Sequence, residues 1–254
     1  MVVLDFDIRM VRFYKKERRI MCMDQLAEKL AALFKEADPS RIDEAVAKAR
    51  SQLTAEATQA KQDGFERLFD AQIATLKDRN VPDQIVELFV SQKGDVLRKA
   101  GEMVIADGNI PFLPVIPRSY RSSYDLMAMV KNGTKVGYTY LYPDEISDTV
   151  ETPNKPYYVY DVENGQATRG KSPRDAEEIL KRQLRSPLTA AEVMALCTHT
   201  DVLSRHYVLA SGSRCKSAGS VPLACLNFGD RPELDWYYVG HAAEQWGSAS
   251  CGSR

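Results

Sequence analysis

The sequence lacks several features that would assign a function directly. It contains no run of about 18 or more consecutive apolar residues, so no transmembrane helix is expected. It has neither the Walker motif G-x-x-x-x-G-K-[ST] nor the hydrolase elbow G-x-S-x-G. It also has no excess of either charge, because 34 Lys and Arg oppose 35 Asp and Glu. Non-specific nucleic-acid binding requires a basic field, so we expect neither a nucleic-acid partner nor a membrane partner.

Cysteines are few and odd in number. The five are Cys22, Cys197, Cys215, Cys225 and Cys251, with no C-x2-C pair and no secretory apolar stretch near the start. This pattern predicts reduced thiols in a cytoplasmic protein and not a disulfide framework. The composition, with 44% hydrophobic and 27% charged residues, is that of a soluble globular protein of one or two domains.

Reactive residue types are concentrated late in the sequence. Four of the five cysteines, all three histidines (His199, His206 and His241) and both tryptophans (Trp236 and Trp246) follow residue 196. Side chains suited to metal, nucleophilic and stacking chemistry therefore gather in this part of the chain, where we expect a functional site.

Residues 1–23 form a basic extension, with six Lys or Arg against three Asp or Glu, a net charge of +3. Alternating apolar and polar residues at its beginning allow a short edge strand followed by a solvated tail. A second interpretation is an upstream extension from a misassigned start, because Met21 and Met23 directly precede a helical pattern. No function is placed in this segment.

Residues 24–109 are predicted to be helical, because their apolar residues recur at three- and four-residue spacing. Four helices are expected, separated at Asp38-Pro39-Ser40, at Gly64 and at Pro82. Ser40 with Asp43 gives a weak capping signal for the second helix. The charges of this region suit a solvated face, and nothing in it suggests catalysis.

Residues 110–254 alternate between short strands and helices. Strands are predicted at residues 110–117, 134–142, 156–162, 206–210, 221–228 and 234–240. Helices are predicted after capping signals at Ser122, Ser172 and Thr189, and Gly/Ser loops connect the last strands. The expected fold class is α+β, with an N-terminal helical segment followed by a mixed, mostly antiparallel sheet region with helices.

Tyrosines mark one predicted strand. Eleven of the twelve follow residue 109, and Tyr138, Tyr140 and Tyr142 share a face of strand 134–142 with Val136. They either form a stacking platform for bases or sugars, or cover a core edge with their hydroxyls in water. Only Lys135 adds a cation within this strand, which favours the core-edge interpretation.

Several motifs resemble those of a known family. They are P-F-L-P-V-I-P (111–117), R-S-P-L-T (185–189), G-S-R-C (212–215) and A-S-C-G (249–252). In this order, over roughly residues 110–254, they resemble a bacterial protein family defined as a domain of unknown function. Tyr237-Tyr238 stands where the family pattern has Cys and Trp, and Leu223-Ala224-Cys225 replaces Ala-Leu-Trp. The resemblance implies no activity, cofactor or site residue.

Binding without catalysis is the function that these residues favour. The Gly/Ser loops with the Trp, His and Arg cluster would bind an unknown protein partner or a small anionic ligand, because a guanidinium and backbone N–H groups suit phosphates and carboxylates. The candidate ligand-binding residues are Arg214, Cys215, Trp236, His241, Trp246, Ser250 and Cys251. No catalytic residue, metal ligand or cofactor is assigned.

Two alternatives stay open. A Cys- or Ser-dependent hydrolase or transferase would use Cys251 or Cys215 as nucleophile, with His241 or His206 as base. A structural zinc site would use Cys215, Cys225, His241 and Cys251, because three thiolates and one imidazole suit zinc.

Overall fold

A computed structural model describes residues 42–216 and 219–254. The predictions for residues 1–23, for the first helix and for the Ser40 cap lie outside the described residues, as does Cys22. Tertiary contacts divide the chain between Ala60 and Lys61, and residues 61–254 form the unit that contains the candidate site.

Helices and strands follow the α+β class predicted from the sequence, which is confirmed. The α-helices are α3 (Ile42–Asp78), α4 (Asp83–Val90), α5 (Lys93–Glu102), α6 (Ser123–Met129), α7 (Pro173–Arg182) and α8 (Ala190–His199). The first strands are β1 (Ile110–Val115), β2 (Lys131–Asn132), β3 (Lys135–Val136), β4 (Tyr138–Thr139), β5 (Ile146–Asp148), β6 (Tyr157–Val162) and β7 (Ser186–Pro187). The remaining strands are β8 (Tyr207–Leu209), β9 (Ser213–Cys215), β10 (Ser220–Leu226), β11 (Pro232–Tyr238), β12 (Trp246–Ser248) and β13 (Ser250–Cys251). None of the described helices combines the length and apolar character needed to span a bilayer.

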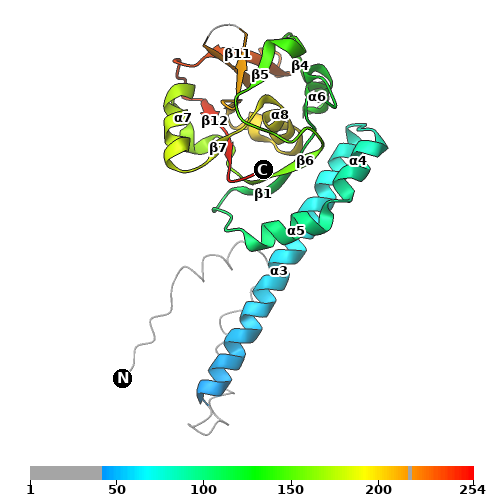
Figure 1. Cartoon of the computed structure of the whole chain (residues 1–254), viewed down its shortest axis with the longest axis vertical. Coiled ribbons are helices and arrows are strands. Elements are labelled where there is room, and N and C mark those ends of the chain that lie inside the picture. Colours follow the sequence, from blue (N-terminus) through cyan, green and yellow to red (C-terminus); the bar gives the residue numbers. More distant parts are fainter. Residues whose placement is uncertain (1–41, 217–218) are drawn as a thin grey trace. The chain divides into compact units, whose positions relative to one another are not determined.

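A five-stranded sheet organises residues 61–254, with the order β12-β8-β10-β11-β4 (Figure 1). Strands β8, β10 and β11 pair antiparallel, whereas the outer strands β12 and β4 run parallel to their neighbours. Two-stranded ladders β1-β6, β13-β7, β2-β3 and β5-β9 surround this sheet. Helix α7 lies beside the β12 end of the sheet and α6 beside the β4 end (Figure 1).

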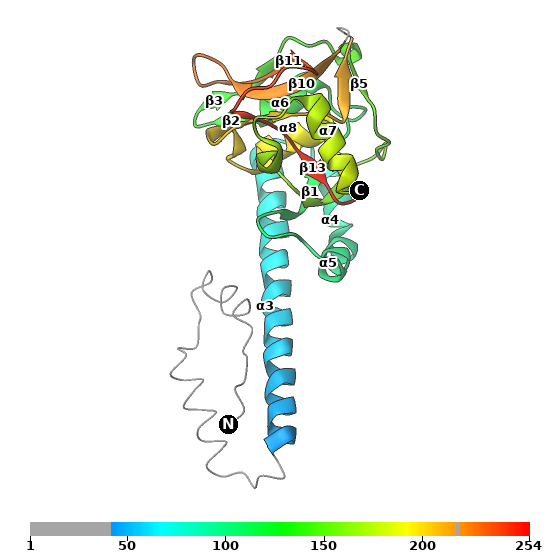
Figure 2. The same cartoon turned by 90° about the vertical axis from the view of Figure 1, so that its left-hand side faces the viewer.

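The two faces of the sheet have different coverings. Helix α8 packs against one face of the sheet (Figure 2). Val208, Ala224 and Leu234 join Met194 of α8 in the main core. Because side chains alternate along a strand, their neighbours in sequence point the other way. Leu209, Val221, Leu223 and Trp246 form a separate small cluster on this opposite face, which we call the second face.

Aromatic side chains join α3 to strands β1 and β6. The ring centroids of Phe65 and Phe112 lie 5.9 Å apart, and those of Phe69 and Tyr158 lie 5.8 Å apart. All four side chains are buried in the main core. The predicted division between residues 109 and 110 stays a proposal about domains, and the core is shared across it.

Two predictions about the helices are wrong. Helix α3 runs through Gly64 without a break, because glycine inside a helix costs about 1 kcal/mol relative to alanine but keeps its backbone hydrogen bonds. The helix expected after Pro82 is divided into α4 and α5. At the division, Ser91 Oγ and Gln92 Nε2 both donate to the carbonyl of Leu88, and such side-chain bonds compete with the helical ladder.

The three capping predictions in the later region are confirmed. Ser122 Oγ accepts from the N–H of Asp125 at the start of α6. Ser172 Oγ does the same with Asp175 at the start of α7. At the start of α8, Thr189 and Glu192 form a complete capping box. These short-range signals fix where α6, α7 and α8 begin.

The prediction of one continuous strand over residues 134–142 is wrong. It is divided into β3 and β4 at Gly137, whose N–H donates to the carbonyl of Val130 at 2.8 Å. A Cβ atom at this position would collide with the carbonyl of Met127, so only glycine fits. The predicted alternation is nevertheless present, because Leu141 is buried while Tyr140 is 78% exposed.

Candidate functional site

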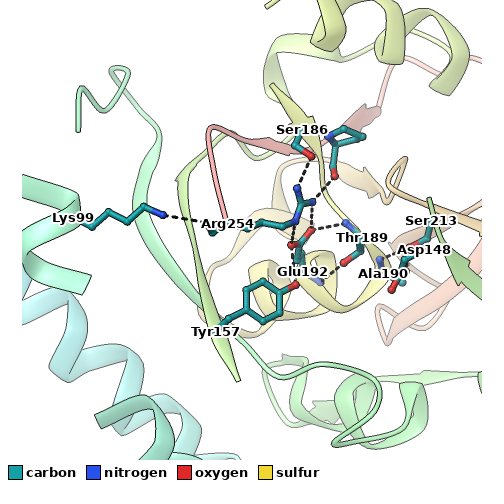
Figure 3. Close-up of polar contacts among 10 residues, drawn as sticks. Lys99, Asp148, Tyr157, Ser186, Thr189, Ala190, Glu192, Ser213 and Arg254 are labelled. Carbon is teal, nitrogen blue, oxygen red and sulfur yellow. Dashed lines mark hydrogen bonds and ion pairs between the residues drawn. The ribbon is translucent and has the colours of Figure 1, made fainter. Parts of the chain in front are cut away.

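A buried ion pair joins Arg254 to helix α8 (Figure 3). Glu192 is 0% exposed, and its two carboxylate oxygens accept from Arg254 Nε at 2.7 Å and Nη2 at 2.8 Å. Tyr157 Oη donates to the same carboxylate at 2.9 Å, and burial together with the charge of Glu192 raises the pKa of Tyr157 above its ordinary value. Arg254 directs its other donors at Ser186 Oγ and the carbonyl of Pro187. Both charges are therefore fully engaged inside the protein.

The same network holds the turn that precedes α8 (Figure 3). The N–H of Thr189 donates to Glu192 Oε2 at 2.8 Å, and the N–H of Ala190 donates to Ser213 Oγ at 2.8 Å. Ser213 Oγ in turn donates to Asp148 Oδ1 at 2.6 Å. The R-S-P-L-T and G-S-R-C motifs thus meet through hydrogen bonds that orient the backbone.

A second ion pair fixes Ser250. Arg185 Nη1 pairs with Asp161 Oδ2, and Arg185 Nε donates to Ser250 Oγ at 2.8 Å. Burial favours a higher pKa for Asp161, but hydrogen bonds from Asn109 and Arg185 outweigh it and lower that pKa. Asp161 therefore remains a bound carboxylate, and the predicted site residue Ser250 is a buried hydrogen-bond acceptor for its partner Arg185.

The described cysteines have the properties of inert thiols. Cys251 is 0% exposed, and burial raises its pKa to about 12. Burial also raises the pKa of Cys215 to about 11 and that of Cys225 to about 12. Nucleophilic cysteines need access and a lowered pKa. The hydrolase or transferase alternative therefore gains no support from these thiols.

The four residues of the zinc alternative do not gather. Cys215 lies in β9, Cys251 in β13 and Cys225 in β10, while His241 follows β11. Among residues 42–216 and 219–254, no three His, Cys, Asp or Glu side chains form a group able to hold a metal ion. The geometry therefore gives zinc no ligand set in the described part of the chain.

The prediction of an open Gly/Ser loop around Arg214 is wrong. Residues Ser213–Cys215 form strand β9, which pairs with β5. Arg214 Nη1 donates to the carbonyls of Ser211 and Ser213, and Nη2 donates to Glu177 Oε1 at 2.6 Å. The N–H of Gly212 donates to the carbonyl of Leu188. A Cβ atom on Gly212 would collide with the backbone of Pro187 and Leu188. These donors are occupied, so this segment is not prepared for an anion.

Three aromatic rings gather on the second face of the sheet, and we call them the aromatic cluster: Tyr237, His241 and Trp246. The ring centroids lie 4.0 Å apart for Tyr237 and Trp246, 5.0 Å for Tyr237 and His241, and 5.4 Å for His241 and Trp246. Trp246 is buried and its Nε1 has no acceptor among the described residues, whereas His241 is exposed. The structure thus brings together two predicted site residues and adds Tyr237.

Residues 169–174, which we call the cation loop, pack beside this cluster. The N–H of Gly170 donates to the carbonyl of Trp246 at 3.1 Å. The N–H of Arg174 donates to the carbonyl of Val239 at 3.0 Å, next to the segment that carries His241. Backbone hydrogen bonds therefore hold the cation loop against the segments that carry the aromatic cluster. Arg174 and Trp246 are 72 positions apart in the sequence.

The cation loop carries charges that the protein itself leaves uncompensated. Arg169, Lys171 and Arg174 are exposed, and neither Lys171 nor Arg174 has a side-chain hydrogen bond or ion pair with any described residue. Arg169 Nε donates to the neutral backbone carbonyl of Glu244 at 3.2 Å. Of the nearby carboxylates, Asp175 accepts from Ser172 at the start of α7. Cations and aromatic rings thus share one surface.

The other predicted site residues are dispersed. Trp236 contacts Tyr238 edge-on at 5.2 Å and points away from the second face, because it alternates with Tyr237 along β11. Arg214 and Cys215 lie in β9, and Ser250 and Cys251 lie in buried β13. The prediction missed the cation loop altogether, because its cations adjoin the cluster only through tertiary backbone bonds.

A cavity of about 10 Å³ lies beside the end of α8, lined by residues that include Leu76, Met129 and Met194. This volume accommodates about one water molecule. His199 also lines it, and its Nδ1 is buried with no hydrogen-bond partner in the part of the chain that the structure describes. Burial lowers the pKa of His199 to about 4, so the ring is neutral in the folded protein.

Comparison with known proteins gives one match. A family model covers residues 67–254, and its description is a family of unknown function. The searches of curated proteins and of solved structures returned no match. The resemblance to a family of unknown function is confirmed, and any function has to be argued from the geometry.

Proposed function

The chain belongs to DUF5701, and we propose that it is a binding protein that holds an anionic group between the aromatic cluster and the cation loop. The group is a carboxylate or a phosphate, carried either by a protein partner or by a small ligand. This proposal retains His241 and Trp246 from the sequence analysis and replaces Arg214 by Lys171 and Arg174.

The observation that carries the proposal is that Lys171 and Arg174 are exposed, have no ion-pair partner in the described part of the chain and adjoin the segments that carry three aromatic rings. Charge-assisted hydrogen bonds from Arg or Lys to carboxylates and phosphates are stronger than neutral ones. Aromatic residues and arginine are also the residue types enriched at the centres of protein interfaces. The buried carboxylates Asp161 and Glu192 are paired with arginines, and three of the four described thiols are buried, which gives no support to a catalytic role for these groups.

A cytoplasmic bacterial protein is part of the same proposal. The four described cysteines are free thiols, and reduced thiols persist in a reducing compartment.

Tryptophan fluorescence tests the binding surface. The chain has two tryptophans, so Trp236→Phe leaves Trp246 in the aromatic cluster as the reporter. We expect saturable changes in its emission with a decapeptide of glutamates or with inorganic phosphate. Lys171→Glu with Arg174→Glu should weaken binding about a hundredfold, at about tenfold for each reversed contact.

The matched control is Lys181→Glu with Arg182→Glu, which makes the same charge change at two exposed positions in the last turn of α7. Saturation with the peptide alone assigns the anion to a protein partner, and saturation with phosphate alone assigns it to a small ligand. Equal weakening by the control and by the cation-loop variant, or no response to either probe, contradicts the proposal.

A further inference from the structure

A strip of exposed tyrosines lies beside strand β4, away from the aromatic cluster. Tyr140 is 78% exposed and Tyr142 is 63% exposed. Tyr138 contacts Tyr140 with ring centroids 5.2 Å apart. Tyr124 of α6 is 40% exposed, and α6 packs against β4. We call these four residues the tyrosine strip.

The backbone beneath the strip is held firmly. Thr139 Oγ1 donates to the carbonyl of Leu234 at 2.7 Å, and the N–H of Leu141 donates to Thr139 Oγ1 at 3.1 Å. Both Thr139 and Leu141 are buried. Tyr140 and Tyr142, which alternate with them along the chain, therefore point outward. Rings on a fixed backbone lose little conformational entropy when a partner binds.

Carboxylates border the strip without cationic partners. Glu145 Oε2 accepts from the N–H of Tyr142 at 2.7 Å, and Glu233 lies beside Tyr138 through the β11-β4 pairing. Neither Glu145 nor Glu233 has an ion-pair partner among the described residues. A carboxylate that accepts one N–H keeps further lone pairs for another donor.

The protein already contains one example of the contact that this surface suits. The guanidinium of Arg231 lies 4.3 Å from the centroid of the Tyr138 ring. Arginine stacks on aromatic rings and binds carboxylates with two parallel hydrogen bonds, which a lysine ammonium cannot do. Tyr140, Tyr142 and Glu145 offer the same ring and carboxylate chemistry, and no arginine of residues 42–216 and 219–254 stacks on or pairs with them.

We propose that the tyrosine strip is a docking surface for an arginine-bearing segment of a partner protein. The carboxylates beside the rings complement a cationic segment and oppose a nucleic acid, whose phosphates they would repel. This surface is independent of the anion site, because it is built from α6, β4 and the residues after β4.

Fluorescence anisotropy with a labelled peptide of alternating arginine and glycine tests this surface. The expected result is saturable binding that Tyr140→Ala weakens about fivefold and that Tyr140→Phe leaves nearly unchanged, because the stacking ring is retained. Glu145→Gln should also weaken it by about fivefold through the lost charge. A peptide with lysine in place of arginine should bind about threefold more weakly.

Two further comparisons make the result decisive. Leu184→Ala serves as the control, since Leu184 is 91% exposed and lies outside the strip. Lys171→Glu with Arg174→Glu should leave arginine-peptide binding intact, even if the anion site fails its own test. Absence of binding, equal affinity for the arginine and lysine peptides, insensitivity to Tyr140→Ala, or preference for a single-stranded oligonucleotide overturns the inference.

Discussion

Charged side chains have opposite environments in two regions of this protein. Around Glu192 and Arg254 the charges are buried and paired, with side chains 0% and 13% exposed. In the cation loop, Lys171 and Arg174 are exposed and have no ion-pair partner among the described residues. Burial without a partner is costly, and exposure without a partner costs little. Paired charges therefore mark what stabilises the fold, and unpaired charges mark where another molecule can bind.

Arg254→Met gives the largest expected effect, because it leaves the Glu192 carboxylate buried without its partner. Breaking a buried pair on one side costs about 3–5 kcal/mol of unfolding free energy. Urea unfolding followed by circular dichroism measures the change. Arg98→Met, which breaks an exposed pair with Glu102, serves as the comparison and should have a much smaller effect on the same free energy.

A double variant separates charge from packing. Glu192→Leu with Arg254→Met removes both charges, and it should be more stable than Arg254→Met alone, because no buried charge remains uncompensated. If the double variant is less stable than the single one, the network stabilises the fold mainly by its hydrogen bonds, and the contrast between paired and unpaired charges loses its basis.

Ser250→Ala gives the next effect, within the second buried pair. It removes the acceptor of Arg185 Nε and leaves a buried donor unsatisfied, at a cost of about 1–3 kcal/mol. Chemical denaturation again measures the loss. Ser91→Ala is the matched control, since the Ser91 hydroxyl donates to Leu88 at an exposed position and should cost less than about 1 kcal/mol. Equal losses from both serine variants would show that burial does not set the cost.

The third prediction concerns pH and His199. Its folded pKa of about 4 lies below the ordinary 6.5, so the unfolded chain binds the proton more readily at acid pH. The stabilising contribution is present above pH 6.5 and is lost as pH falls toward 4. Between pH 7 and pH 5.5 the protein should lose about 1 kcal/mol through this group. His199→Gln should remove that part of the pH dependence in thermal unfolding, and an unchanged profile would exclude His199 as its source.

Short-range features of the fold could be predicted from the sequence. The caps at Ser172 and Thr189 depend on residues three positions apart, and the alternation around Leu141 depends on strand periodicity. Gly137 shows the limit of such reasoning. Alternation continues across it, but β3 pairs with β2 in a local hairpin, whereas β4 pairs with the distant strand β11. Local pattern predicts which face a residue occupies, and distant contacts decide where a strand ends.

The candidate site depended on contacts that no local pattern contains. The capping signal at Thr189 predicts the start of α8, but the pairing of Glu192, the other residue of that capping box, with Arg254 spans 62 positions. The abundance of polar residues late in the sequence suggested a site at Arg214 and Cys251, but most of those residues face inward and bond to one another. Of the predicted residues, His241 and Trp246 remain in a cluster on the second face, and their cationic neighbours come from residues 169–174, which include the start of α7.

The smallest expected effect on stability comes from the two cations of the proposed binding surface, Lys171 and Arg174. Lys171→Ala with Arg174→Ala should change the unfolding free energy by less than about 0.5 kcal/mol, because exposed side chains without partners contribute little. The backbone N–H of Arg174 that bonds to Val239 is retained in alanine, so the loop keeps its place. The same variant should lose glutamate-peptide binding in the fluorescence titration. A stability loss as large as that of Ser250→Ala would mean that these cations support the fold, and the assignment of the loop to recognition would then fail.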